Sequence, residues 1–158
     1  MDSIDYALLG ELMQKGRATW SELAHKVGLS SPGVMDRIRR LEDKKVIKGY
    51  RAVIAPEAVG LELTAFVFIS LEKPTQRSAF LKRVRALDEV QECHQVTGDY
   101  DYLLKIRCAH TRSLDKIVSI GLKTINGVSK THISIVMGTE KETSELALPL
   151  EEQNESAS

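Results

Sequence analysis

The stretch TWSELAHKVGLSSPGVMDRIRRLEDKK, residues 19–45, predicts two short helices joined by a tight turn. Thr19 and Glu22 form a capping-box pattern, in which a hydroxyl and a carboxylate each bind a free amide of the first helical turn. Gly28 can adopt the left-handed conformation that ends a helix, and Ser30 is a good N-cap for the next one. The stretch therefore has the arrangement of a helix-turn-helix.

The second of these helices has one apolar side and one charged side. Val34, Ile38 and Leu41 recur at helical spacing and form a single apolar stripe. The opposite side can enter the major groove of DNA and bring guanidinium groups to guanine edges or phosphates. A helical hairpin whose charged face is merely solvated explains the same spacing. The residues that we predict to contact double-stranded DNA are Ser31, Pro32, Gly33, Asp36, Arg37, Arg39, Arg40 and Lys44.

The distribution of charge favours the DNA-binding interpretation. The chain of 158 residues has no net charge, which alone argues against a nucleic-acid-binding protein. However, residues 1–51 contain 10 Lys and Arg against 7 Asp and Glu, whereas residues 140–158 contain 1 against 6. Most of the positive charge in the first third follows Val34. The basic patch therefore coincides with the proposed recognition helix.

Several classes of protein are disfavoured by the composition. No apolar run approaches the roughly 20 residues needed to cross a bilayer, and the start MDSID lacks the features of a signal peptide. We therefore expect a cytoplasmic protein with no membrane partner. Cys93 and Cys108 lie in segments that resemble buried strands, so we expect reduced core residues rather than a disulfide.

A third helix is expected before the helix-turn-helix. Ile4, Leu8 and Leu12 recur at helical spacing and end near Gly16. After the second helix, the run VIKGYRAVI predicts a strand or a strand-like linker. The core expected for this three-helix domain consists of Leu8, Leu12, Leu23, Ala24, Leu29, Val34, Ile38 and Leu41, with Trp20 at an edge.

The second half of the chain predicts a different architecture. Strands are expected at residues 63–71, 90–97, 100–108 and 128–137, with helices at 76–87 and 111–122. The order β-α-β-β-α-β is that of a ferredoxin-like fold. We thus expect an α+β protein with a winged-helix-like helix-turn-helix domain at 1–51, a linker at 52–60, a ferredoxin-like domain at 61–139, and an acidic tail at 140–158 that is disordered or weakly helical.

The first strand of the sheet is apolar on both sides. Leu63, Ala65, Val67, Ile69 and Leu71 share one side, and Phe66 and Phe68 lie on the other. In a sheet covered by helices on one face only, those phenylalanines would remain exposed. We therefore expect two sheets to pack face to face in a dimer. The alternative is that the N-terminal domain or the tail covers them.

These motifs together resemble the leucine-responsive and asparagine-regulator (Lrp/AsnC) family of transcription factors. The resemblance rests on residues 17–24, VGLS at 27–30, VMDRIRRLE at 34–42, VIKGY at 46–50 and VQECHQVTGDYDYLLKIR at 90–107, and covers about residues 2–139. It implies a helix-turn-helix joined to a ferredoxin-like domain that binds amino acids, dimers formed through the sheet, and assembly of dimers into octamers or discs around DNA.

The resemblance also implies a site for an amino-acid effector of unknown identity. Backbone amides near Gly98 can bind an α-carboxylate, and Asp99 or Asp101 can pair with the α-ammonium group. A plain hairpin turn needs the same residue types. The residues expected at this site are Thr97, Gly98, Asp99, Tyr100 and Asp101, with weaker support for Thr131 and Ser134.

An enzyme is not expected. Cys93 and His94 are adjacent in a strand and so point to opposite faces, which prevents them from acting together on a substrate or a metal. No phosphate-binding loop or CxxC motif is present, and we predict no catalytic residue, metal or cofactor. The alternative to a DNA-binding regulator is an amino-acid-binding oligomer whose N-terminal helices contact protein partners.

Overall fold

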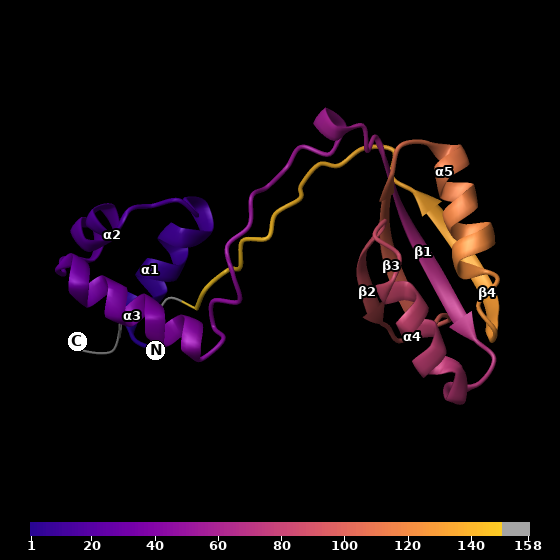
Figure 1. Cartoon of the computed structure of the whole chain (residues 1–158), viewed down its shortest axis with the longest axis horizontal. Helices are drawn as coiled ribbons and strands as arrows, with labels where there is room; N and C mark the ends of the chain where they lie inside the picture. The colour runs from indigo at the N-terminus through magenta and orange to yellow at the C-terminus, as the bar shows by residue number, and fades with distance from the viewer. Residues whose placement is uncertain (150–158) are drawn as a thin grey trace, which may run out of the picture. The chain divides into compact units, whose positions relative to one another are not determined.

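The computed structural model describes residues 1–149 and divides them into two compact units. One unit, which we call the DNA-binding unit after the expectation from its sequence, contains Met1–Val53 together with the described residues from Lys141 onward. The other, which we call the sheet unit, contains Ile54–Glu140. The sheet unit is thus inserted between two segments of the first unit (Figure 1).

Three helices build the DNA-binding unit, α1 (Ser3–Gln14), α2 (Trp20–Val27) and α3 (Ser31–Asp43). The predicted helix ends are confirmed: Thr19 and Ser30 are the N-caps of α2 and α3, and Gly28 ends α2 with a left-handed φ of 67°. Asp2 and Asp5 form a further capping box at the start of α1, which the sequence analysis did not identify.

Most of the expected helical core is buried. Leu8, Leu23, Ala24, Val34, Ile38 and Leu41 are buried as predicted, together with Leu9, which was not expected. Leu12 and Leu29 are only partly buried against this cluster. Trp20 is 44% exposed, because the first position of α2 turns away from the core.

The chain after α3 contains no strand up to Glu62, so of the two alternatives expected for residues 46–54, a strand or a strand-like linker, the structure has the linker. Without a pair of strands there, the described DNA-binding unit has three helices and no β-wing. Ile47 nevertheless packs against the helical core, and the Tyr50 hydroxyl donates a hydrogen bond to Glu42 at 2.9 Å. These contacts hold the first part of the linker against α3.

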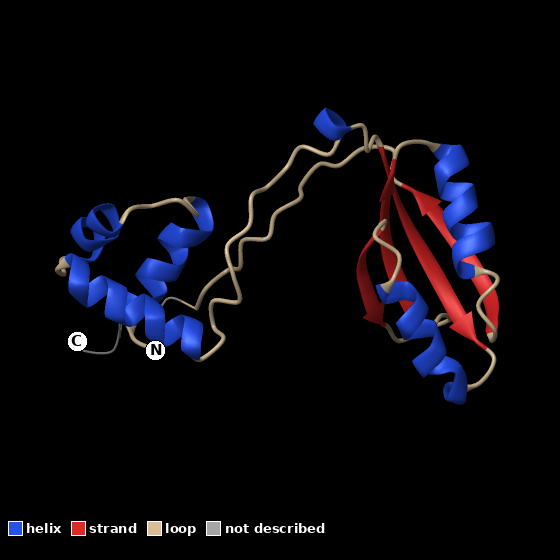
Figure 2. Ribbon diagram, in the orientation of Figure 1, coloured by secondary structure: helices blue, strands red, loops and turns tan. Residues whose placement is uncertain are grey.

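The sheet unit has the predicted β-α-β-β-α-β order and contains one antiparallel sheet with strand order β2-β3-β1-β4 (Figure 2). This arrangement confirms the expected ferredoxin-like architecture. A 3₁₀ turn precedes α4, and the expected second helix changes at Ile117 from α-helical to π-helical winding. The elements are β1 (Leu63–Leu71), α4 (Arg77–Arg85), β2 (Val90–Gln95), β3 (Tyr102–Cys108), α5 (Thr111–Lys116) with its π-helical continuation (Ile117–Leu122), and β4 (Val128–Ile135), with 3₁₀ turns at Glu57–Val59 and Pro74–Gln76.

Both helices cover the same face of the sheet. Ala65, Val67 and Ile69 of β1 are fully buried in the core that includes Phe80 of α4 and Val118 beyond α5. Phe66 and Phe68 alternate with them and therefore lie on the other face, where both are only half-buried. Cys93 and Cys108 are free thiols in β2 and β3, and burial raises the pKa of each.

Candidate functional site

All eight residues predicted to contact DNA lie on α3 or at its C-cap. The apolar stripe of Val34, Ile38 and Leu41 anchors the helix in the core, and this fixes which side faces outward. We call the outward side the α3 face. Pro32, Asp36, Arg39, Arg40 and Lys44 are exposed on it, whereas Ser31, Gly33 and Arg37 are half-buried.

The arginines of the α3 face differ in their partners. Arg40 forms an exposed ion pair with Asp36 one turn earlier, with 2.9 Å between the guanidinium and the carboxylate. Such pairs contribute roughly 0–1 kcal/mol, so this one does not prevent Arg40 from binding another anion. Arg39 is exposed and has no ion pair within residues 1–149. Two guanidinium groups are therefore available on this surface.

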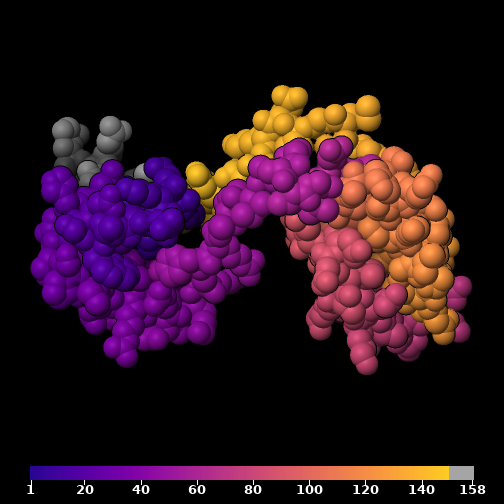
Figure 3. Space-filling model, turned by 45° about the horizontal axis from the view of Figure 1, so that its top comes forward, coloured from indigo at the N-terminus to yellow at the C-terminus, as the bar shows by residue number. Residues whose placement is uncertain are grey.

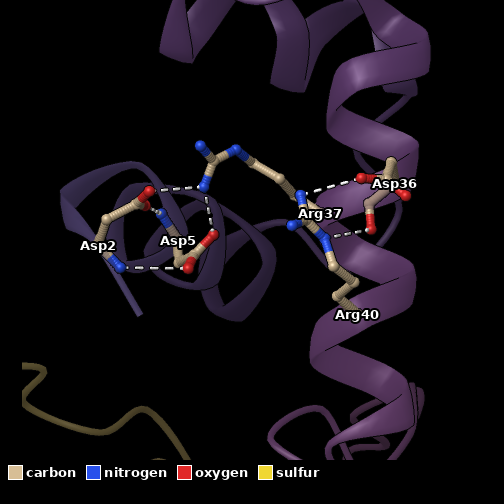
Figure 4. A network of polar contacts seen from close by, with 5 residues as sticks. All are labelled: Asp2, Asp5, Asp36, Arg37 and Arg40. Atoms are coloured by element: carbon tan, nitrogen blue, oxygen red, sulfur yellow. Dashed lines mark hydrogen bonds and ion pairs between the residues drawn. The ribbon is translucent and has the colours of Figure 1, made fainter.

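Arg37 contacts the beginning of α1 instead of projecting freely (Figure 4). Its guanidinium donates hydrogen bonds to Asp2 at 2.8 Å and to Asp5 at 2.9 Å. The Asp5 backbone amide and then Arg37 lower the pKa of the Asp2 carboxyl, and the two carboxylates raise the pKa of Arg37. This contact links α1 to α3 across more than 30 residues of sequence, which local patterns cannot reveal.

The loop between β2 and β3 is a closed hairpin against the end of β1. The Val96 amide donates to the Asp101 carbonyl, and the Asp101 amide donates to Ile69, both at 2.9 Å. One carboxylate oxygen of Asp101 accepts a hydrogen bond from the Leu71 amide at 2.8 Å. Gly98 has a φ of 114°, in the region that favours glycine. Asp101 thus holds the hairpin to β1.

The remaining predicted effector residues are only partly brought together. Asp99 is exposed at the tip, and its carbonyl accepts a hydrogen bond from the Ser70 hydroxyl at 3.4 Å. Thr131 pairs with Ile69 and Ser134 with Phe66. Because these two β4 residues are an odd number of positions apart, their side chains point to opposite faces of the sheet. They therefore cannot line one site on a single face.

Other residues, which the sequence analysis missed, surround the hairpin on the open face of the sheet. The Tyr100 ring lies 5.4 Å from Phe68 and 6.2 Å from His132, centroid to centroid. The Lys130 ammonium lies 5.1 Å from the centre of the Tyr100 ring. Lys130 and His132 alternate with Thr131 along β4, so the strand register, once known, identifies them.

These features define a class of protein, a helix-turn-helix unit joined to a ferredoxin-like unit that carries a hairpin and an uncovered sheet face. Within the described residues no group of His, Cys, Asp or Glu could hold a metal ion, and no helix is long and apolar enough to cross a membrane. Comparison with known proteins identifies the family within this class.

The chain matches two family models, an AsnC-type helix-turn-helix domain over residues 1–42 and an Lrp/AsnC ligand-binding domain over residues 64–146, the second covering more than half of the chain. It is 40% identical over 150 residues to the leucine-responsive regulatory protein of Haemophilus influenzae, covering 94% of this chain and 90% of that one. The chain belongs to the Lrp/AsnC family of transcriptional regulators, as the sequence analysis predicted.

Solved structures agree with this assignment. A transcriptional regulator from Neisseria meningitidis in complex with L-methionine is similar with a TM-score of 0.91 and 33% identity, covering 94% of this chain and 97% of that one. A feast or famine regulatory protein of Mycobacterium tuberculosis, also complexed with L-methionine, has a TM-score of 0.84 and 39% identity over 92% of this chain and 97% of that one. The ligand-binding family model ends at residue 146, which is beyond the end of the resemblance at residue 139.

Proposed function

We propose that this protein regulates transcription by binding specific duplex DNA through the α3 face, and that an amino acid bound near the β2–β3 hairpin modulates this binding. The observation that carries the proposal is the exposed cationic surface of α3, on a helix whose opposite side is fixed in the core. A helix held in this way can present Arg39 and Arg40 to base edges or phosphates without losing its packing.

In this proposal the residues of the α3 face have two roles. Ser31, Pro32, Gly33, Asp36, Arg39, Arg40 and Lys44 contact DNA, with the small residues at the start of the helix allowing close approach. Arg37 positions the helix, because its guanidinium is already bound by two carboxylates of α1. A DNA phosphate would have to compete with both of them.

For the effector we propose an amino acid with an apolar side chain, and L-methionine is the first candidate because two structural relatives were solved with it. Backbone amides around Gly98 suit an α-carboxylate. Asp99 is the better partner for the α-ammonium group, since it has no ion pair within the described residues, whereas Asp101 is hydrogen-bonded to Leu71. We also propose that Thr97 contributes to this site and that dimers assemble into octamers. Because Thr131 and Ser134 lie on opposite faces of the sheet, at most one of them contributes.

We further propose that two subunits pack through the open faces of their sheets. Phe66 and Phe68 are half-buried on this face, and no helix of the sheet unit covers it. A dimer would bury these aromatic side chains and would join two recognition helices. The two half-sites of the operator should then lie about 34–36 Å apart, or a multiple of that distance.

The experiment is a DNA-binding titration of the full chain at several salt concentrations, first with random-sequence duplex and then with duplexes selected from it. We expect Arg39→Ala and Arg40→Ala to weaken binding. A base contact should cost roughly 1–3 kcal/mol on the selected site only, and a phosphate contact should weaken all duplexes and lower the salt slope by about one.

Arg83→Ala is the matched control, because Arg83 is an exposed arginine on α4 in the sheet unit. It should bind DNA as the wild type does. Wild-type affinity in both α3 variants, or no binding of any duplex by the wild type, would contradict the DNA-binding proposal and favour an oligomeric sensor that contacts protein partners.

A further inference from the structure

The C-terminal segment of the described chain, residues 141–149, belongs to the DNA-binding unit. It contains no helix or strand, so the weakly helical form of the expected tail is absent from these residues, and residues 150–158 of that tail lie outside the described part. The segment, yellow in Figure 3, reaches the indigo surface of the N-terminal helices. The first residues of the chain and the last described residues therefore contribute to one unit.

Two contacts attach the segment to α1. The Leu148 side chain is half-buried against the helical core. The Leu146 amide lies 3.4 Å from the Met13 sulfur and donates to it. Between the segment and α1 runs a groove lined by Tyr6 and Gly10 on the helix and by Glu145 on the segment.

The two leucines of the segment act in different ways. Leu146 is 70% exposed, so it contributes mainly through its backbone. Leu148 contributes its side chain to the core. The Glu145 amide donates to the Thr143 hydroxyl at 3.0 Å, a local hydrogen bond just before these contacts. Leu148 is therefore the residue whose side chain anchors the segment.

α1 in turn touches the recognition helix. Asp2 and Asp5 at its start bind Arg37 of α3, and Leu8 and Leu9 pack in the same core as Ile38. A helix that is contacted by the segment on one side and by α3 on another can transmit changes between them. Loss of the segment would uncover part of α1 and weaken the support of α3.

We propose, on the basis of the DNA-binding function inferred above, that α1 carries a docking surface for residues 141–149 of this chain, and that its occupation keeps α3 in the conformation that binds DNA. The acidic tail then has a defined role: its first part is a strap on the DNA-binding unit. Because the sheet unit lies between Val53 and Lys141 in the sequence, the linker joins it to the DNA-binding unit at its N-terminal end and the strap does so at its C-terminal end.

The test compares Leu148→Ser with Leu146→Ser in the full chain. Hydrogen exchange is measured for α1 and α3, with β1 and β3 of the sheet unit as internal references, and affinity is measured for a random-sequence duplex. We expect Leu148→Ser to exchange α1 amides about tenfold faster, to increase exchange in α3, and to bind DNA more weakly, with β1 and β3 unchanged. Leu146→Ser, which exposes no new apolar surface, should resemble the wild type.

Leu148→Met should restore protection, since it keeps an apolar side chain of similar volume. Wild-type exchange in α1 for Leu148→Ser would overturn the docking surface, whatever the affinity for DNA. Faster exchange in α1 with unchanged exchange in α3 and unchanged DNA affinity would overturn the strap's role in supporting α3. The exchange measurement does not involve DNA, so its outcome is separate from the test of DNA binding.

Discussion

The two units of the molecule differ in how completely a single chain covers their apolar residues. In the DNA-binding unit each helix turns one apolar stripe inward. The outer surface of this unit is charged, with capping boxes at the helix ends and an ion pair between α1 and α3. In the sheet unit the helices cover one face only, and Phe66 and Phe68 remain half-buried on the other. The first unit is complete within one chain, whereas the second presents a surface suited to another copy.

The largest effect should come from a charge on the open face of the sheet. In the proposed dimer Phe68→Asp would bury an unpaired carboxylate, at a cost of about 3–5 kcal/mol. We expect this variant to dissociate to monomers in sedimentation experiments while its far-ultraviolet circular dichroism stays that of the wild type.

Ile69→Asp is the matched control, because Ile69 is the next residue of β1 and is fully buried under the helices. It should unfold the sheet unit and not merely separate subunits. If Phe68→Asp had the same oligomeric state as the wild type, the open face would not be the dimer surface. The two units would then differ only in the residue types on their surfaces.

The next effect concerns the effector hairpin, where the sheet unit uses exposed polar groups. Asp99→Asn should weaken L-methionine binding about tenfold or more in a calorimetric titration, since it removes a charged partner of the ammonium group. Asp101→Asn keeps an oxygen that accepts from Leu71 and should bind nearly as the wild type does. The reverse order would identify Asp101 as the ammonium partner, and no heat with the wild type would leave the hairpin as a turn.

The contrast between the units also explains which parts could be predicted from sequence. Helix ends in the DNA-binding unit depend on neighbouring residues such as Thr19, Glu22 and Gly28, so local chemistry determines them. Both sides of strand β1 are apolar, yet its alternation placed Phe66 and Phe68 on the face that the helices leave open, as the structure shows. The strand pairing that sets the neighbours of these side chains joins residues far apart in the chain, so local sequence does not reveal it.

The candidate sites show the same limit. The α3 face follows from helical periodicity, and all of its predicted residues lie on one helix or at its C-cap. The partners of Arg37 are 32 and 35 residues away, and the neighbours of Tyr100 depend on the register of β4. The strap was missed because a short acidic segment without periodicity resembles a disordered tail, although Leu146 and Leu148 alternate in it.

A smaller effect should come from the contact between α1 and α3 on the charged exterior of the DNA-binding unit. We expect Arg37→Gln and Asp5→Asn to weaken DNA binding each by a similar factor, and the double variant to be no weaker than either single one. This non-additivity is the result expected when two residues act through the same contact. Asp5→Asn is informative by itself, because removing a negative charge near DNA should otherwise strengthen binding.

Arg39→Gln combined with Asp5→Asn serves as the reference cycle, since Arg39 has no ion pair in the described chain and its effect should be additive. Additive losses for Arg37→Gln as well, with a shallower salt slope, would show that Arg37 contacts phosphate and does not position the helix.

The smallest effect should be the pH dependence of the capping box at the start of α2. The Glu22 carboxylate binds Lys15 and also accepts from the Thr19 amide and hydroxyl, which together lower its pKa from 4.5 to about 2. Because the folded pKa is depressed, the carboxylate stabilises the fold at pH values above about 4.5, and this contribution disappears as the pH falls towards 2. The side chains of Lys15 and Glu22 are about half exposed, so the effect should be modest.

Trp20 is the only tryptophan and begins α2, so its fluorescence follows unfolding of the DNA-binding unit. We expect Glu22→Gln to unfold more readily than the wild type at pH 6 and to differ from it progressively less between pH 4.5 and 2. The control Glu57→Gln, at an exposed position of the sheet unit, should change neither the stability of the DNA-binding unit nor its pH dependence. A constant difference across this range would mean that Glu22 acts through its size or neutral hydrogen bonds, and that the charged exterior of the DNA-binding unit contributes less to its stability than its closed core does.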